Sequence, residues 1–178
     1  MKDRTSVILF THDTPTPLTN LYQSAETLGS DRLAAAVAAN YFYPVKNVLC
    51  IDAGTCIKYN FVNFKNEYIG GAISPGIKMR FKALNNFTAR LPLIEMDETF
   101  SELVGTNTRE SILSGVETAS VAEVEGMISN YLQLYPDLIV MLTGGDTNFF
   151  VKRLKKPIFA DQNLILKGLN IILDHSLK

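Results

Sequence analysis

The stretch LCIDAGTCIKYN, residues 49–60, decides the fold of this chain. An apolar run stops at Asp52, turns through Ala53-Gly54-Thr55 and leaves as a second apolar run. This pattern predicts two strands joined by a tight turn, where turn chemistry alone would favour Asn-Gly. A glycine lets the backbone approach a phosphate, amides and a threonine hydroxyl donate to its oxygens, and a carboxylate holds a cation. A plain polar hairpin tip is the alternative interpretation of the same residues.

Helix and strand signals extend in both directions from this hairpin. The Ala-rich residues 31–43 predict a helix, with Ser30 or Asp31 as its N-cap and Pro44 as its end. Strands are expected at residues 6–10, 47–52, 56–64, 67–74, 138–142 and 157–160. Further helices are expected at residues 75–91, where Pro75 suits a first helical position, then at 108–134, after residue 146 and at 164–177.

The order of these elements predicts the fold class. From residue 47 it reads β-β-β-α-α-β-α-β-α, an antiparallel start followed by alternating strands and helices. Such an order implies an α/β protein with a mixed sheet covered by helices. It is the order of one lobe of an actin-like, ribonuclease-H-like nucleotide-binding fold.

Composition excludes several classes of protein. The chain has 178 residues, 47% of them hydrophobic and 20% charged, and a formal net charge of -1, as in an ordinary globular protein. The only basic cluster, residues 152–156, is short, so neither a nucleic-acid surface nor a membrane surface is expected. The two cysteines and two histidines have no zinc-ligand spacing, and the amino-terminal apolar run is too short for a leader or membrane segment. We therefore expect a cytoplasmic protein.

The segment Gly29-Ser30-Asp31-Arg32 precedes the Ala-rich helix and has two interpretations. In the first, Ser30 caps the helix, Asp31 favours its amino end and Arg32 is a surface residue. In the second, Asp31 is a base for a substrate hydroxyl, and the guanidinium fork of Arg32 binds a substrate carboxylate. The residues alone leave both open.

Three more segments carry glycines or hydroxyls where elements meet. Gly70 and Gly71 lie near the end of a strand that leads to a helix, and glycines at such a position let a ligand approach the backbone closely. Residues 143–146, Thr-Gly-Gly-Asp, follow the most apolar strand, and ligands of α/β sheets bind at strand ends. Thr108 opens the long helix, where capping is a sufficient explanation. The long helix itself is expected to be core or a dimer face.

Taken together and in order, five blocks resemble the type III pantothenate kinases, which belong to the acetate/sugar kinase–Hsp70–actin superfamily. The blocks are LGSDRLAAAVAA at 28–39, VLCIDAGTCIKYNFV at 48–62, YIGGAISPGI at 68–77, LVGTNTRESILSG at 103–115 and MLTGGD at 141–146. The resemblance implies ATP-dependent phosphorylation of pantothenate to 4′-phosphopantothenate, the first step of coenzyme A biosynthesis. It also implies a homodimer.

The resemblance assigns roles residue by residue. The acid of the family's G-x-D-R block is the proposed general base, which implies that role for Asp31. Asp52 falls on the family's monovalent-cation ligand, for K⁺ or NH₄⁺. The pantothenate-binding residues implied are Gly29, Ser30, Arg32, Thr108 and Tyr22. The residues expected to bind ATP, which acts with Mg²⁺, are Gly54, Thr55, Gly144 and Gly145.

The chain departs from the family at its amino-terminal end. The family begins with a strand and a D-x-G-N-T loop, and residues 1–30 contain no such pattern. We therefore expect a truncated first lobe, with residues 1–45 as its remnant including the GSDR block, and a nearly complete second lobe at residues 46–178. The alternative to an active kinase is a non-catalytic relative that binds pantothenate or a nucleotide, or serves as a dimerisation module.

Overall fold

A computed structural model describes residues 7–177. Its sheet has the strand order β1-β4-β3-β2-β5-β6. The strands are β1 (Thr19–Asn20), β2 (Val48–Ala53), β3 (Cys56–Val62), β4 (Glu67–Pro75), β5 (Ile139–Thr143) and β6 (Phe159–Ala160). β2, β3 and β4 form an antiparallel meander, whereas β5 runs parallel to β2 and β6 parallel to β5. This mixed sheet is the ribonuclease-H-like arrangement expected from the element order.

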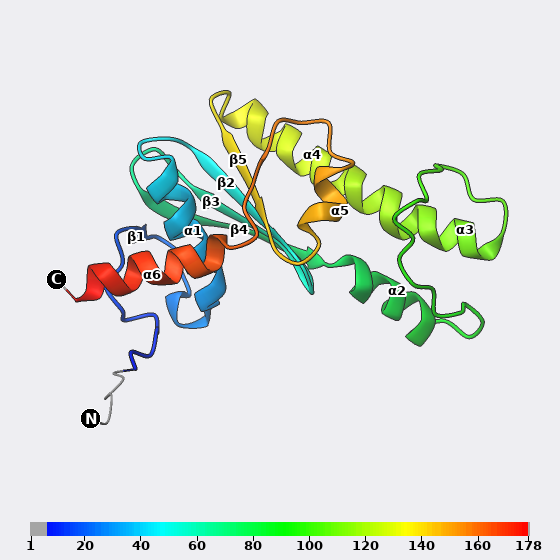
Figure 1. Ribbon diagram of the computed structural model, residues 1–178, viewed down its shortest axis with the longest axis horizontal. Coiled ribbons are helices and arrows are strands. Elements are labelled where there is room, and N and C mark those ends of the chain that lie inside the picture. The colour runs from blue at the N-terminus through cyan, green and yellow to red at the C-terminus, as the bar shows by residue number, and fades with distance from the viewer. Residues whose placement is uncertain (1–6, 178) are drawn as a thin grey trace, which may run out of the picture.

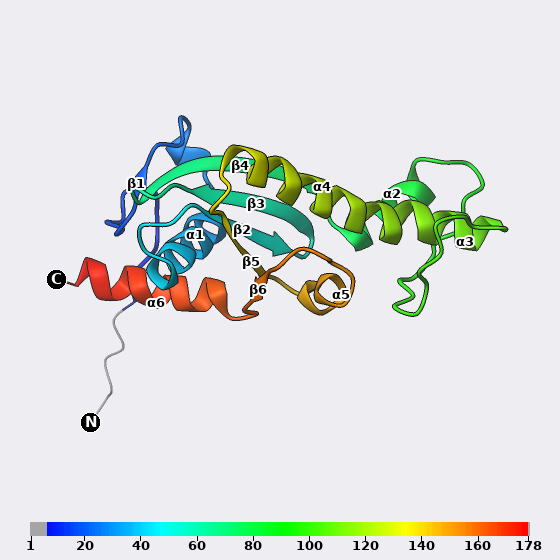
Figure 2. The same ribbon diagram turned by 90° about the horizontal axis from the view of Figure 1, so that it is seen from above.

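Helices cover both faces of the sheet (Figures 1 and 2). They are α1 (Ser30–Phe42), α2 (Ile77–Asn86), α3 (Thr108–Leu113), α4 (Ala119–Leu134), α5 (Thr147–Val151) and α6 (Leu164–Ser176), with a 3-10 turn η1 (Ala25–Thr27). α1 and α6 lie together on one face, α4 lies on the other, and α2 and α3 extend to the far end of the molecule (Figure 2). Within residues 7–177, no helix combines the length and apolar character needed to cross a membrane.

Strand alternation sorts the side chains between the two faces. In β2, Leu49 and Ile51 belong to the apolar cluster that contains α4, whereas Val48 and Cys50 belong to the cluster that contains α1. Because neighbouring side chains of a strand point to opposite faces, the next even-numbered residue, Asp52, faces the α1 side. The sheet thus directs the polar side chains of the β2–β3 hairpin toward the start of α1.

The alanines of α1 fit a helix that is covered on two sides. α1 packs against β2 and β3 and also against α6, and residues 32–40 are all buried. Small side chains let the two helices approach closely, and Gly168 of α6 completes this contact. β1 and α1 thus contact the same sheet as the later elements; the expected division of the chain after residue 45 stays a prediction.

Three expectations about local structure are wrong in detail. Residues 7–10 form no strand, and Ser6 lies outside the described residues. Pro75 is the last residue of β4, paired with Cys56, so α2 begins only at Ile77 and ends at Asn86. The long helix contains a π-helical segment, η2 (Ser114–Thr118), between α3 and α4. The other strands and helices lie where the sequence predicted them, within a few residues.

Gly168→Ala is expected to lower the free energy of unfolding by about 1–3 kcal/mol, because overpacking a tight contact forces the backbone to shift. A Cβ atom at this position would lie 1.9 Å from the carbonyl oxygen of Ala34 in α1. Asn170→Ala, on the exposed side of the same helix, is the control and should change stability by less than about 0.5 kcal/mol. Urea unfolding of the three proteins measures both effects. An equal effect of the two substitutions would contradict the close α1–α6 contact.

Candidate functional site

A cross-strand charge pair lies next to the turn of the β2–β3 hairpin. Asp52 and Lys58 are directly paired in the antiparallel register, and both side chains face α1. The ammonium nitrogen of Lys58 lies 2.7 Å from Oδ2 of Asp52 and 2.6 Å from Oδ2 of Asp31, at the start of α1. The exposed fraction of the side chain is 8% for Asp52, 20% for Lys58 and 46% for Asp31. Lys58 therefore joins the two acids that the sequence singled out, and the exposed one is Asp31.

The charges of this triad support one another. Burial alone would raise the pKa of Asp31, but the hydrogen bond and positive charge of Lys58 outweigh it, and the pKa is lowered. Burial alone would lower the pKa of Lys58, but its bonds to the two carboxylates outweigh it, and the pKa is raised. Asp31 is therefore ionised at neutral pH, and Lys58 carries its charge.

Arg32 is buried, which contradicts its interpretation as a surface residue. Only 5% of the surface of Arg32 is exposed, and its Nε donates to Oδ1 of Asn60 in β3 at 2.8 Å. The same Oδ1 accepts from the hydroxyl of Tyr68 at 3.1 Å. One terminal guanidinium nitrogen, NH2, is buried without a hydrogen-bond partner among the described residues. A buried donor without a partner is costly, so this nitrogen still has a hydrogen bond to give, although less than 1 Å² of it is exposed.

Tyr22 completes the surroundings of this guanidinium. The Arg32 carbon Cζ lies 5.4 Å from the centre of the Tyr22 ring, within the range of a cation–π contact. Gly70 of β4 has a φ of +130°, and a Cβ atom there would lie 3.2 Å from the Tyr22 ring. Gly70 thus makes room for an aromatic side chain of the protein, whereas the sequence suggested room for a ligand.

The start of α1 is not capped as expected. α1 begins at Ser30 with Gly29 as its N-cap, and no side chain makes a capping hydrogen bond. Asp31 instead uses Oδ1 to accept from the backbone N–H of Arg32 at 2.8 Å. Ser30 is exposed beside it. The structural interpretation of Ser30 as the cap is therefore wrong, and the exposed Ser30 hydroxyl lies next to Asp31 in the chain.

Glycine-containing loops converge on the same hairpin. Gly144 has a φ of +97°, and a Cβ atom there would lie 2.5 Å from Oδ1 of Asp52. The backbone N–H of Gly76 donates to the carbonyl of Thr55 at 3.1 Å. A Cβ atom at Gly54 would lie 3.9 Å from the nitrogen of Gly145. The loop after β5 and the start of α2 therefore both lie beside the turn of the hairpin. Backbone amides of several loops can bind one phosphate group only when the loops lie this close to one another.

Thr108 is separated from the other predicted site residues. It is the first residue of α3, after the N-cap Asn107, whose side chain accepts from the N–H of Glu110. α3 lies at the far end of the molecule from α1 (Figures 1 and 2). Within one chain, Thr108 therefore does not meet the site at Asp31.

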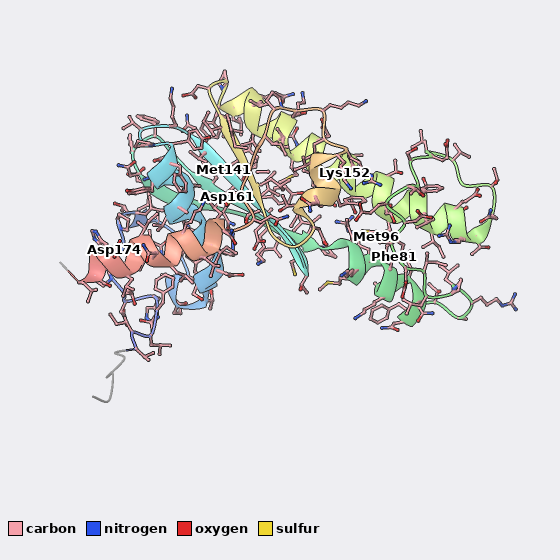
Figure 3. All side chains as sticks on the ribbon, in the orientation of Figure 1. Phe81, Met96, Met141, Lys152, Asp161 and Asp174 are labelled. Carbon is pink, nitrogen blue, oxygen red and sulfur yellow. The ribbon has the colours of Figure 1, made fainter. Side chains whose placement is uncertain are left out.

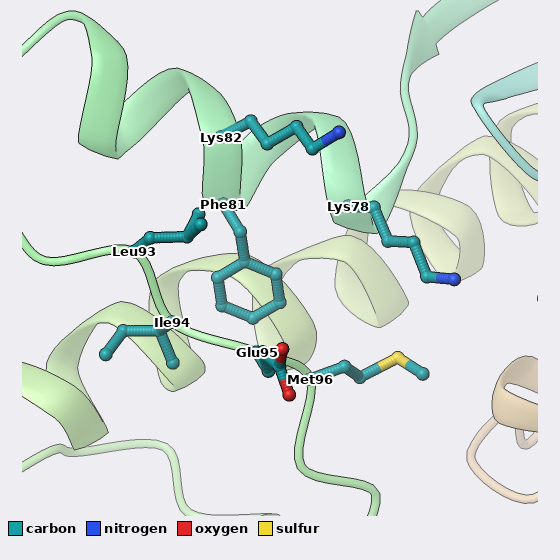
Figure 4. Close-up of a pocket in the computed structure, with 7 residues that line it drawn as sticks. All are labelled: Lys78, Phe81, Lys82, Leu93, Ile94, Glu95 and Met96. Carbon is teal, nitrogen blue, oxygen red and sulfur yellow. The ribbon is translucent and has the colours of Figure 1, made fainter.

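The described part of the chain also has a cavity of about 410 Å³ between α2 and the loop that follows it (Figure 4). Phe81 points from α2 toward Met96 and Glu95, and the two labelled side chains Phe81 and Met96 lie together in Figure 3. Lys78 and Lys82 are at the rim. None of the predicted site residues lines this cavity. The candidate site is instead a surface of loops around the hairpin.

No group of three or more His, Cys, Asp or Glu side chains that could hold a metal ion occurs among residues 7–177. Asp146, which follows the two glycines after β5, is a half-buried carboxylate whose pKa is raised by burial, an effect that the charge of Lys78 reduces in part. Asp146 and Asp52 are thus the carboxylates beside the glycine loops. Because Asp52 is already paired with Lys58, Asp146 is the carboxylate left for Mg²⁺, which commonly uses only one or two carboxylates and is otherwise held by nucleotide phosphates and water.

Sequence reasoning missed the residues that tie the site together. Lys58 lies within residues 49–60, but no local pattern there indicates a role for it, and Asn60 and Tyr68 carry only strand signals. Counting outward from a two-residue turn at Gly54-Thr55 pairs Asp52 with Ile57, whereas the register in the structure is centred on Thr55 and pairs Asp52 with Lys58. No local signal was available for the contact between Lys58 and Asp31, which are 27 residues apart.

Comparisons with known proteins agree with the blocks found in the sequence. A family model described as type III pantothenate kinase matches residues 2–130. The type III pantothenate kinase of Phocaeicola vulgatus is 48% identical over 96% of this chain and 70% of the relative. That of Bacteroides fragilis is 49% identical over 92% of this chain and 67% of the relative. That of Flavobacterium johnsoniae is 44% identical over 93% of this chain and 67% of the relative.

A solved structure shares the fold. The crystal structure of a Campylobacter jejuni protein described as a Baf family transcriptional activator has a TM-score of 0.64 and 23% sequence identity. The likeness covers 90% of this chain and 69% of that chain. The structural likeness concerns the fold alone, whereas the family model and the identities to the three kinases concern ancestry. The family model and the sequence identities show that this chain belongs to the type III pantothenate kinase family.

Proposed function

We propose that the chain catalyses the ATP-dependent phosphorylation of pantothenate to 4′-phosphopantothenate, the first step of coenzyme A biosynthesis. The observation that carries the proposal is that Asp31, Arg32 and the glycine loops all contact the same hairpin, at Lys58, Asn60 and Asp52 respectively. A phosphoryl transfer requires a base near the hydroxyl, a group that orients the substrate and a surface that binds phosphates. Asp31 is suited to the role of the base, Arg32 to that of the orienting group, and the glycine loops to that of the phosphate-binding surface.

Asp31 is proposed as the general base. Its carboxylate is partly exposed, ionised and held by the N–H of Arg32 and the ammonium of Lys58. Each carboxylate oxygen has a further lone pair that can accept the primary hydroxyl of pantothenate. As the hydroxyl oxygen attacks the γ-phosphorus of ATP, its proton passes to Asp31 and the bond to ADP breaks.

Arg32 is proposed to orient pantothenate. The substrate carries a carboxylate at the end opposite its primary hydroxyl, and a guanidinium pairs with a carboxylate through charge-assisted hydrogen bonds. The NH2 nitrogen of Arg32 has no partner among the described residues, and the guanidinium is held in place by the hydrogen bond from its Nε to Asn60. Tyr22, which lies over the guanidinium, is proposed to pack against the same substrate, with Gly29 and Ser30 at the start of α1 completing its site.

The turn of the hairpin is proposed to receive ATP. Gly54 and Thr55 at the turn and Gly144 and Gly145 after β5 present backbone N–H groups and a hydroxyl where a side chain would obstruct the phosphates. Mg²⁺ bound to the phosphates would neutralise part of their charge, with Asp146 as the neighbouring carboxylate, since Asp52 is already paired with Lys58. Backbone amides are fixed in position before the reaction, so little reorganisation is needed.

The direct test measures phosphopantothenate formation by the purified chain with ATP, Mg²⁺ and pantothenate, using mass spectrometry of the product. Product that depends on both substrates supports the proposal. If no product forms, while calorimetry shows that pantothenate or ATP still binds, the chain is a binding module and the proposed catalysis is wrong.

The proposal includes a homodimer formed through α4. Four exposed small residues follow one stripe of the η2–α4 helix: Gly115, Ala119, Ala122 and Gly126. Small residues let two helix backbones approach closely across a two-fold axis. A second copy of the chain would also be needed to bring a Thr108 to the pantothenate site, since Thr108 of the same chain lies at the far end.

Gly126→Arg is expected to convert the dimer to a monomer in light scattering. A Cβ atom at Gly126 meets nothing within 4 Å, and arginine favours a helix more than glycine does, so the fold should be kept. Asp174→Arg, on the exposed part of α6, is the control and should remain dimeric. A dimeric Gly126→Arg protein would place the interface elsewhere, and a monomeric parent protein would contradict the homodimer itself.

A further inference from the structure

The ammonium of Lys58 occupies the space between Asp31 and Asp52. Lys58 Nζ lies 2.6 Å from Asp31 Oδ2 and 2.7 Å from Asp52 Oδ2, and the Asp52 side chain is nearly buried. Because Lys58 is the direct cross-strand partner of Asp52, the backbone register fixes the base of its side chain. The position of this charge is thus built into the hairpin.

This arrangement does not fit a free monovalent cation on Asp52. Such a cation needs oxygen ligands, and Oδ2 of Asp52 already accepts from Lys58. The other oxygen, Oδ1, faces Gly144 so closely that a Cβ atom there would lie 2.5 Å away. A K⁺ ion beside Oδ2 would also be repelled by the ammonium, since like charges at contact distance oppose each other. The carboxylate that the family resemblance gives to K⁺ or NH₄⁺ is therefore already satisfied.

We propose that Lys58 supplies, as part of the chain, the monovalent positive charge that the resemblance assigns to a free cation. Its ammonium is the tethered counterpart of NH₄⁺, with up to three donors for oxygens. Two of these donors are used by the acids, and the hairpin turn with its proposed phosphate site is three residues away in the chain. For the reaction, the inference rests on the proposed function. It makes the kinase independent of K⁺ and NH₄⁺.

The first test measures cation binding and needs no catalysis. Thallium(I) is the probe, as a spectroscopically visible substitute for K⁺, and its binding is followed by ²⁰⁵Tl NMR line broadening in nitrate buffer. The parent protein should not bind Tl⁺ specifically. Lys58→Ala leaves an empty space between two carboxylates and should bind Tl⁺ in competition with K⁺. Lys58→Met fills that space without charge and should not bind.

The second test measures phosphopantothenate formation with and without KCl, with tetramethylammonium chloride keeping ionic strength constant. The parent rate should change by less than about twofold, since screening alone has a small effect at close range. Lys58→Ala should lose about 10²-fold without K⁺, the typical effect of removing one stabilising group, and regain most of it with K⁺ or NH₄⁺. Lys58→Met should lose the same factor without regaining it.

The outcomes separate this inference from the proposed function. Specific Tl⁺ binding by the parent protein that is lost in Asp52→Asn would overturn the inference, as would K⁺ stimulation of the parent by about tenfold or more, which is far beyond screening. If no version of the chain forms product, the proposed function fails. The Tl⁺ result then still decides where the cation charge comes from. Thermal unfolding of each variant identifies any that fail to fold, and the measurements on the parent protein need no variant.

Discussion

Replacing Asp31 with asparagine is expected to lower kcat for phosphopantothenate formation by about 10²–10⁴-fold, the usual contribution of a general base. Asparagine keeps the size of the side chain and can still accept from the N–H of Arg32, so α1 should begin at the same place. It cannot take the proton of the attacking hydroxyl. Lys58 keeps its contact with Asp52, so its charge stays near the hairpin.

The measurement is steady-state kinetics with both substrates, because a base should change kcat more than KM. Asp174→Asn is the matched control, since it removes an exposed carboxylate of α6 that lies apart from the hairpin. It should leave kcat unchanged within about twofold, as surface substitutions usually do. A kcat of Asp31→Asn as high as that of the control would show that Asp31 is not the base.

Arg32→Gln is expected to lower kcat/KM for pantothenate by about 10²-fold or more, because a charge-assisted hydrogen bond contributes about 1.5–3 kcal/mol and two can form. Glutamine can still donate to Asn60 but offers no fork for a carboxylate. Arg32→Lys keeps the positive charge without the planar fork and should fall between glutamine and the parent protein. The effect should appear mainly in KM, since Arg32 is proposed to bind a part of the substrate that does not react.

A modified substrate separates this role from a loss of folding. Pantothenol has a hydroxymethyl group in place of the carboxylate, so it cannot form the pair with Arg32. The parent protein should therefore prefer pantothenate strongly, and Arg32→Gln should lose most of that preference. A variant that is merely unstable would lose activity toward both substrates equally, and an unchanged preference would contradict the carboxylate site.

Local chemistry was sufficient for much of the fold. The apolar runs on either side of Gly54 predicted the hairpin, and the Ala-rich run predicted α1, because strand alternation and helix-forming residues act over a few neighbours. Pro75 was misplaced because proline suits both a first helical position and the last residue of a strand. The π-helical segment of the long helix has no signal in a simple 3.6-residue pattern.

The site brings together residues that are far apart in the chain, and local sequence patterns do not report such contacts. Asp31 and Asp52 were singled out separately, each beside a plain structural interpretation. Their roles stay proposals. Lys58 becomes their common neighbour only because α1 packs against the hairpin and brings Asp31 next to it. The burial of Arg32 has the same origin, since a residue at a helix start is exposed or buried according to what packs on it.

By itself, the sequence determined the order of the elements, the hairpin with its carboxylate and the family to which five ordered blocks belong. Only the tertiary structure decided which charges meet. It places the ammonium of Lys58 between two acids and leaves one nitrogen of Arg32 without a partner among the described residues. It also places Thr108, at the start of α3, far from Lys58 and Arg32 (Figure 1). The physical reason is that secondary structure follows from neighbouring residues, whereas ion pairs and buried donors follow from the register of strands and the packing of helices between residues far apart.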